Sequence, residues 1–287
     1  MYKASKNVPV SRRIFFQYSS LLSLASLSLR SQDSTTAKFE LLRSITPKQE
    51  VIRLFNGRDL TGLYTWLEDT GYEDPSGAFS VQEGLLRVSG EPHGYVATKQ
   101  AYRDYHLIVE YKWGKETHGN TTVRDSGILL HANGPDGYRN PWMASIECQV
   151  AQGCVGDFVV IQGKAENGKV TIPVSITSDV VIGPDGRTRW KPGGKRKVYD
   201  GNQFWWSEHD PQFVELLDRR GRWDIDSPGD EWTRIDCICA GKRIVVKVNG
   251  ITVNACYEAY PSSGKILLQA EGFEVYFRKF ELHPLRD

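Results

Sequence analysis

A chain of 287 residues can hold one large domain or two small ones, and all-β domains of about 200–250 residues commonly form a single unit. We therefore predict one domain. Its 36 Lys and Arg residues against 35 Asp and Glu residues leave a net charge of +1. Without an excess of positive charge to neutralise phosphates, a nucleic-acid or anionic-membrane partner has no electrostatic support, and a neutral substrate fits better.

The N-terminal segment has the pattern of an export signal. Basic residues that end in the pair Arg12–Arg13 precede the apolar, serine-rich run 14–29, which is too short to span a bilayer stably. The arginine pair resembles a bacterial twin-arginine signal, which exports folded proteins. We predict a signal peptide over 1–33, a linker over 34–50 and a domain over 51–287. The protein is then periplasmic or extracellular, with no membrane span in the mature chain; the alternative is a disordered serine-rich tail.

After the linker, short runs rich in Val, Ile, Tyr, Phe and Trp alternate with Gly, Pro, Asn and Asp, which is typical of an antiparallel sandwich or barrel. The pair Asn249-Gly250 between two such runs predicts a two-residue hairpin turn. No run keeps a period of 3.6 residues, so we expect little helix.

The five cysteines leave at least one thiol unpaired in an exported protein. Disulfides between Cys148 and Cys154, or between Cys256 and either Cys237 or Cys239, stay open. No Cys or His pair has structural zinc spacing, so we predict no structural metal site, while a divalent cation as a cofactor stays open.

The segment Ser145-Ile-Glu-Cys-Gln-Val150 alternates strictly. Because side chains of a strand point to opposite faces in turn, Glu147 and Gln149 share one face, and the apolar residues between them share the other. This pattern predicts a strand with one polar face that is a candidate for chemical reactivity. Trp142, just upstream, is a candidate for stacking against a sugar ring.

Four segments in a fixed order carry a resemblance to a known family: Leu54-Phe-Asn-Gly-Arg-Asp-Leu-Thr-Gly62, Asp125-Ser-Gly-Ile-Leu-Leu-His131, the Glu147 strand, and 264–280 with its Leu-Gln-Ala-Glu-Gly and Val-Tyr-Phe-Arg motifs. From about Val51 to Leu285 the chain resembles the 3-keto-disaccharide hydrolase domain family. The resemblance implies an all-β, concanavalin A-like jelly-roll sandwich of two antiparallel sheets. It also implies an enzyme that acts on sugars oxidised at carbon 3.

The residues at the Glu147 strand disfavour a standard retaining glycosidase. Sandwich glucanases place two carboxylates on one strand, whereas here the amide Gln149 follows Glu147. A 3-keto group acidifies the hydrogen on carbon 2, so one base and one enolate stabiliser suffice for elimination of the group on carbon 1. On the resemblance, we predict Glu147 or His131 as the base and Arg124 or Lys112 as the stabiliser.

Further residues are predicted to bind substrate: Gln149, Glu110, Lys112, Trp142, Gln269 and Glu271. Each has a structural alternative. Glu147 could form a structural ion pair, and Gln149 could bond to backbone at the edge of the core. Glu110 and Lys112 could form a cross-strand ion pair on a solvated face, and Trp142 could pack in the core.

Three functions are thus open: a glycoside-cleaving enzyme for 3-keto sugars, a non-catalytic carbohydrate-binding module, and a structural domain. The resemblance favours the enzyme. A 3-keto substrate implies a functional partner, a sugar 3-oxidoreductase that makes it. The chain has no Gly-x-Gly-x-x-Gly fingerprint of its own for a nicotinamide cofactor. The oligomeric state is not predicted.

Overall fold

The computed structural model describes residues 39–138 and 141–286. The predicted signal peptide, 1–33, and the start of the linker lie outside the described residues. Among the residues that are described, the regular structure consists of strands without helices, as expected from the missing helical period. That part of the chain accordingly holds no helix long and apolar enough to cross a membrane.

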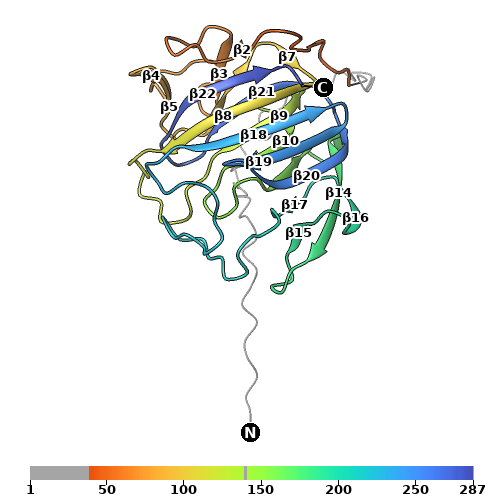
Figure 1. The fold of residues 1–287 in the computed structure, drawn as a ribbon. Coiled ribbons are helices and arrows are strands. Elements are labelled where there is room, and N and C mark those ends of the chain that lie inside the picture. Colours follow the sequence, from red (N-terminus) through yellow and green to blue (C-terminus); the bar gives the residue numbers. More distant parts are fainter. Residues whose placement is uncertain (1–38, 139–140, 287) are drawn as a thin grey trace, which may run out of the picture. The chain divides into compact units, whose positions relative to one another are not determined.

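Two antiparallel sheets form the body of the domain (Figure 1). The seven-stranded sheet has the spatial order β17 (Gln203–Phe204), β11 (Phe158–Ile161), β10 (Ala144–Gln149), β9 (Gly127–Asn133), β21 (Lys265–Ala270), β6 (Gly94–Thr98) and β3 (Leu63–Leu67).

The eleven-stranded sheet is the larger layer. Its order is β15 (Thr188–Trp190), β14 (Ser175–Ile182), β20 (Ile251–Tyr260), β19 (Arg243–Val248), β18 (Thr233–Ala240), β8 (Tyr105–Trp113), β22 (Val275–His283), β5 (Leu85–Val88) and β4 (Phe79–Gln82), with β16 (Lys195–Tyr199) beside β14 and β2 (Ile52–Arg53) beside β22. Two small pairs complete the strands: the parallel pair β1 (Ser44–Ile45) and β7 (Ala101–Tyr102), and the hairpin of β12 (Gly163–Lys164) and β13 (Val170–Ile172).

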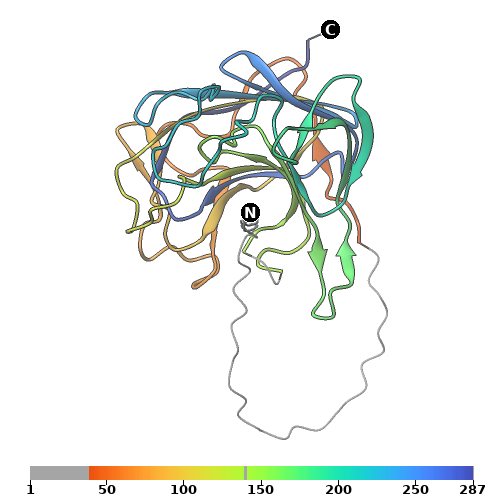
Figure 2. The same ribbon diagram turned by 90° about the horizontal axis from the view of Figure 1, so that it is seen from below.

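Figure 2 shows the two layers from below. Alternate residues of both sheets fill the space between these layers. Ile146 and Cys148 of β10 join Leu107 and Val109 of β8 in one apolar core. Full burial of each Val, Leu, Ile or Phe side chain contributes roughly 1.5–3 kcal/mol, so this core is the main source of stability. The arrangement confirms the predicted concanavalin A-like jelly-roll sandwich.

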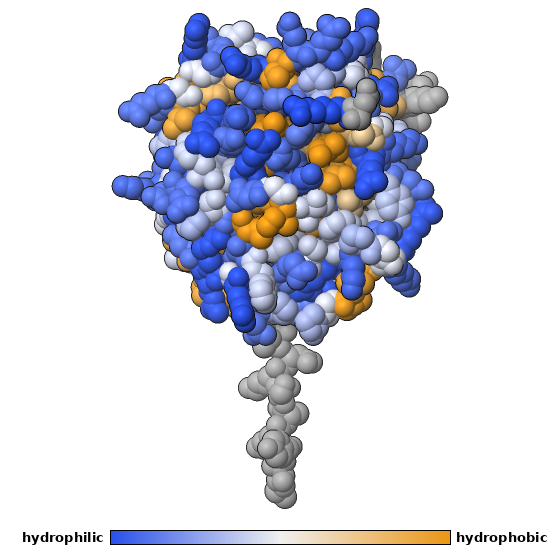
Figure 3. Space-filling view, in the orientation of Figure 1, coloured by the Kyte–Doolittle hydropathy of each residue, from blue (hydrophilic) through white to orange (hydrophobic). Residues whose placement is uncertain are grey.

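The outer face of the eleven-stranded sheet is mostly hydrophilic, as the space-filling view shows (Figure 3). Glu110 of β8 lies here, with its carboxylate 2.6 Å from Arg278 Nε and 3.3 Å from Lys279 Nζ. Lys112 lies with its Nζ 5.1 Å from the ring centroid of Trp232. The prediction that Glu110 and Lys112 bind substrate beside Glu147 is therefore wrong, because β8 belongs to the other sheet. For Glu110 the alternative of a cross-strand ion pair holds.

The hairpin predicted at Asn249-Gly250 is confirmed. Val248 of β19 pairs directly with Ile251 of β20, and both turn residues have positive φ, 47° and 85°. Two successive positive φ values define the turn type that favours Asn-Gly in two-residue hairpins.

All five cysteines are free, buried thiols. Cys239 and Cys256 pair with the same residue, Ile244, from its two sides, so they lie two strands apart. Strands are about 4.8 Å apart and a disulfide needs Cα atoms within roughly 7 Å, so this pair cannot be bridged. Cys148 lies in the core between the sheets, whereas Cys154 belongs to a separate small cluster.

His131 of β9, predicted as the alternative base, does not face the same side as Glu147. The ladder between β9 and β10 has an irregular register here, and His131 takes a φ of 53° in the left-handed region. A bulge of this kind breaks the alternation of side chains. The imidazole lies in the core, edge-on to Tyr105 at 5.9 Å between ring centroids, with Nδ1 3.0 Å from the carbonyl oxygen of Pro261.

We expect His131 and His209 to lower the free energy of unfolding as the pH drops from 6.5 towards 4. Burial lowers the pKa of His131, and also that of His209, from 6.5 to about 4. Between these values the unfolded chain binds protons that the folded protein does not, so stability present above pH 6.5 is lost on acidification. Each histidine adds a slope of about 1.4 kcal/mol per pH unit. Denaturant unfolding at a series of pH values measures this slope.

Buried Asp226, whose pKa is raised to about 6, binds a proton in the folded protein over the same range and opposes this slope. The variant His131→Gln leaves Asp226 unchanged, so its slope should be lower than that of the original protein by the contribution of one histidine, about 1.4 kcal/mol per pH unit. His93 offers a matched control because its side chain is 41% exposed. The variant His93→Gln should leave the slope unchanged. Equal slopes in the original protein and in His131→Gln would contradict the assignment.

Candidate functional site

The outer face of the seven-stranded sheet, here called the Glu147 face, is formed by residues from six neighbouring strands. Glu147 pairs with Val159 on one side and Leu129 on the other. Leu129 then pairs with Leu267 of β21, and Leu267 with Ala97 of β6. Residues of one such row point to the same side, so the face is defined by Tyr64, Trp66, Tyr95, Ala97, Gly127, Leu129, Glu147, Gln149, Val159, Leu267 and Gln269.

The centre of the Glu147 face is the space above Gly127. A Cβ atom at this position would lie 2.1 Å from Gln269 Oε1 and 2.6 Å from Glu147 Oε1. The two side chains therefore converge on one point from β21 and β10. Both side chains are only 1% exposed. Only glycine leaves room for this convergence, so the sequence motif Asp125-Ser-Gly serves the geometry of the site.

The carboxamide of Gln269 is the second notable group. Its nitrogen and oxygen are buried and have no hydrogen-bond partner among the described residues. A buried amide without partners costs roughly 1–3 kcal/mol, so it points to a ligand that completes its hydrogen bonds. The predicted position of Gln269 beside Glu147 is thus observed.

Gln149 shares the Glu147 face, but its side-chain oxygen accepts hydrogen bonds from the backbone N–H groups of Val150 at 2.9 Å and Ala151 at 3.3 Å. Gln149 thus makes the bond to backbone that was its structural alternative. The side-chain oxygen of Gln149 stabilises the turn after β10 rather than facing a ligand.

One end of the face holds an aspartate between three tyrosines. Asp136 Oδ1 accepts hydrogen bonds from the hydroxyls of Tyr64 and Tyr95, both at 2.6 Å, and Oδ2 accepts one from Tyr72 at 3.0 Å. Burial, and then the bond to Asp136, raise the pKa of Tyr64 and of Tyr95, so both phenols stay protonated as donors. Lys265 Nζ lies 2.7 Å from the Tyr64 hydroxyl.

No sequence motif predicts this Asp136 cluster as a whole. A period-two signal was present in Leu63-Tyr-Thr-Trp-Leu67, which puts Tyr64 and Trp66 on one face of β3. Trp66 itself is closed on both sides, because its ring stacks on Tyr95 at 5.6 Å and a Cβ at Gly137 would lie 2.2 Å from its edge. The cluster therefore fixes the segment around Asp136 on the sheet.

Arg124 does not lie on the Glu147 face. Its guanidinium binds Asp218 through Nε at 2.7 Å and through a second nitrogen at 3.2 Å, and donates to the Gly114 carbonyl at 3.0 Å. It thus ties the start of β9 to the end of β8 at the edge of the sandwich. The structure therefore does not bring Arg124, predicted as an enolate stabiliser, to the same face as Glu147. Lys112 lies on the other sheet.

Two predicted substrate-binding residues lie near the face without defining it. Trp142 packs against the apolar part of the face, which includes Met143, and its ring is 6.1 Å from that of His93. Glu271 follows β21 two residues after Gln269 and is half-buried. Of the three predicted catalytic residues, only Glu147 lies on the face.

A group of three potential metal-binding side chains lies away from the Glu147 face. Cys154, Asp157 and His209 bring potential metal ligands within 4.8 Å of one another. The atoms already have partners: Asp157 accepts from the Trp206 N–H at 2.7 Å and from Gln203 at 3.0 Å, and His209 contacts the Gly153 carbonyl. These contacts join the turn after β10 to the segment after β17, which is a structural role.

Comparisons with solved structures give matches of low identity. A candidate glycosyl hydrolase from Parabacteroides distasonis has 17% identity, covers 82% of this chain and 94% of its own, and has a TM-score of 0.49. A β-glucanase from Bacillus licheniformis has 13% identity, 84% and 100% coverage and a TM-score of 0.44. A carbohydrate binding module from Bacillus subtilis has 8% identity, 77% and 96% coverage and a TM-score of 0.42.

With TM-scores below 0.5, these structures carry no argument about the activity of this chain. No curated protein matches its sequence. The family model of the 3-keto-alpha-glucoside-1,2-lyase-like domain, however, matches residues 50–283, which is nearly the whole predicted domain and agrees with the resemblance seen in its four motifs. The chain therefore belongs to this 3-keto-disaccharide hydrolase family of carbohydrate-active domains.

Proposed function

We propose that this protein cleaves the glycosidic bond of 3-keto-glycosides, including 3-keto-disaccharides, on the Glu147 face. One observation carries the proposal: Glu147 and the unpartnered carboxamide of Gln269 converge on the space above Gly127. A carboxylate beside a neutral hydrogen-bonding group is what proton abstraction next to a ketone requires. A double-carboxylate glycosidase would need a second acid at the position of Gln149.

In the proposed first step, the Glu147 carboxylate takes the proton on carbon 2 of the sugar. The electron pair of this C–H bond forms a double bond between carbons 2 and 3, and the ketone oxygen becomes an enolate oxygen. Gln269 presents Oε1 to the space above Gly127. When the carboxamide turns by 180°, its Nε2–H can donate to the enolate oxygen, which replaces Arg124 and Lys112 in this role. Because the carboxamide is already buried, it does not have to lose hydration during the reaction.

In the second step, the ketone re-forms and the electron pair moves to a double bond between carbons 1 and 2. The bond from carbon 1 to the aglycone oxygen breaks, and the proton held by Glu147 returns to this oxygen. Addition of water across the new double bond, OH to carbon 1 and H to carbon 2, completes a net hydrolysis. Direct displacement of the aglycone by water is the alternative route to the same products.

The N-terminal sequence pattern supports a proposal for where the reaction takes place. We propose that residues 1–33 direct export and that the enzyme works in the periplasm or outside the cell. Its substrate already carries a ketone at carbon 3, so a sugar 3-oxidoreductase must supply it. The two proton-transfer steps use only Glu147 and the substrate, and a divalent cation that polarises the ketone is compatible with the same scheme.

We expect Glu147→Gln to lower kcat/KM for 3-keto-trehalose by about 10²–10⁴-fold, because the amide cannot accept the proton. The change keeps the side-chain shape, so the melting temperature should change little. The assay follows aglycone release in deuterated water together with deuterium at carbon 2. Deuterium at carbon 2 selects elimination, and its absence during release selects direct displacement.

Glu110→Gln is the control, because Glu110 is also buried but lies on the other sheet. Its activity should equal that of the original protein. Saturable binding of the 3-keto sugar without release or exchange would instead support the non-catalytic carbohydrate-binding module.

We expect Gly127→Ala to lower kcat/KM by about 100-fold, because a new Cβ must displace the ends of Glu147 and Gln269, and a misplacement of about 1 Å has this effect. The displaced atoms are the ends of flexible side chains, so the free energy of unfolding should fall by only about 1–3 kcal/mol. Gly229→Ala is the matched control, since a Cβ there meets nothing within 4 Å. Full activity in Gly127→Ala would refute the proposed geometry.

A further inference from the structure

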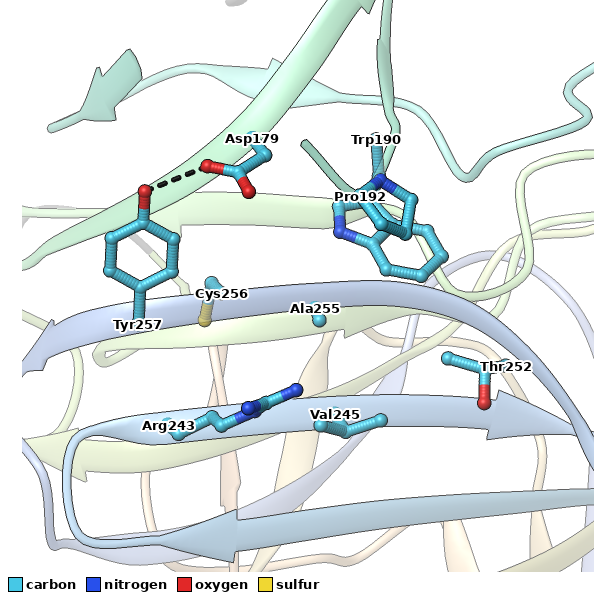
Figure 4. A pocket seen from close by; sticks show the side chains of 9 residues that line it. All are labelled: Asp179, Trp190, Pro192, Arg243, Val245, Thr252, Ala255, Cys256 and Tyr257. Carbon is cyan, nitrogen blue, oxygen red and sulfur yellow. Dashed lines mark hydrogen bonds between the residues drawn. The ribbon is translucent and has the colours of Figure 1, made fainter. Parts of the chain in front are cut away.

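A pocket lies on the eleven-stranded sheet, on the opposite side of the sandwich from the Glu147 face. One wall consists of Asp179, Trp190 and Pro192, from β14, β15 and the turn after β15; the other consists of residues of β19 and β20, among them Arg243, Thr252 and Tyr257 (Figure 4). Its volume is about 540 Å³. This value lies within the range of roughly 300–1,000 Å³ that is typical of small-molecule sites.

The walls of this pocket are held in place before any ligand binds. Asp179 accepts a hydrogen bond from the Tyr257 hydroxyl at 2.8 Å and one from the Gly193 N–H at 3.3 Å, so one carboxylate joins both walls. The backbone N–H of Lys191 adds a bond to the Asp179 carbonyl at 2.9 Å. A preformed pocket avoids the entropy cost of ordering its walls when it binds a ligand.

The chemistry of the pocket matches a neutral sugar. Trp190 and Pro192 supply apolar surface against which the C–H face of a sugar ring can stack. The Arg243 guanidinium has no ion-pair partner among the described residues and is exposed, and Asp179 has no cation within 4.0 Å among them. One free cation and one carboxylate offer donors and acceptors to hydroxyl groups without selecting a charged ligand.

We propose that this pocket, here called the Trp190 pocket, is a second carbohydrate-binding site that takes a neutral sugar. Sugar binding in the Trp190 pocket does not require the reaction on the Glu147 face, because the apolar core lies between the two sites. A ring would stack on Trp190, with its hydroxyls shared between Asp179 and Arg243. The site would hold the enzyme on a glycan while the Glu147 face acts on a 3-keto end.

Titration calorimetry with trehalose and with cellotetraose tests this proposal on the full-length protein carrying Glu147→Gln, so that no turnover occurs. In this background Trp190→Ala and Arg243→Ala should each weaken binding about tenfold. Trp223→Ala is the control, because Trp223 is 50% exposed and lies outside the pocket. Binding by that variant should be unchanged.

Trp190 also packs against the core, so its variant could lose structure; Arg243 is exposed, so its variant should fold. The proposal is overturned if neither sugar binds saturably, or if Arg243→Ala binds as the parent does while Gln269→Ala abolishes binding. The last result would place all binding on the Glu147 face. Because these outcomes are read as affinities, they are separate from success or failure of the catalytic proposal.

Discussion

The burial of alternate residues between two facing sheets is the constraint on which the rest of this structure depends. Ile146 and Cys148 are fully buried in the core, so Glu147 between them has to point outwards. A slip of the ladder by one residue would put the carboxylate into the core and two apolar side chains outside. The same packing that stabilises the fold thus fixes the position of the proposed base.

The alternation of buried and outward-facing residues explains why some features could be predicted from the sequence. In β10 the period of two is unbroken, and the prediction that Glu147 and Gln149 share a face is confirmed. The Asn249-Gly250 turn is local and is likewise confirmed. Both patterns are complete within a few residues, so long-range contacts are not needed to interpret them. The four family motifs add the sandwich architecture, which periodicity alone leaves open between sandwich and barrel.

The errors have physical causes that a strand pattern does not contain. Alternation tells which residues share a face of one strand, but not which sheet the strand joins. For this reason the prediction placed Glu110 and Lys112 beside Glu147, although β8 belongs to the other sheet. The left-handed residue His131 reverses the alternation inside β9, and no glycine marks the bulge. Asp136 collects hydroxyls from residues 41 to 72 positions away along the chain, which only the folded chain brings together.

The sandwich also explains how the proposed site can contain buried polar side chains, which lower the stability of the folded protein. Burying Glu147 and an unpartnered Gln269 opposes folding, since buried polar groups lose their hydration. The apolar core on the other side of the same strands offsets this cost and holds the backbone of β9, β10 and β21 rigid. Because that core separates the Glu147 face from the Trp190 pocket, the two share no side chain. Changes at one should therefore add to changes at the other, as expected for sites without common partners.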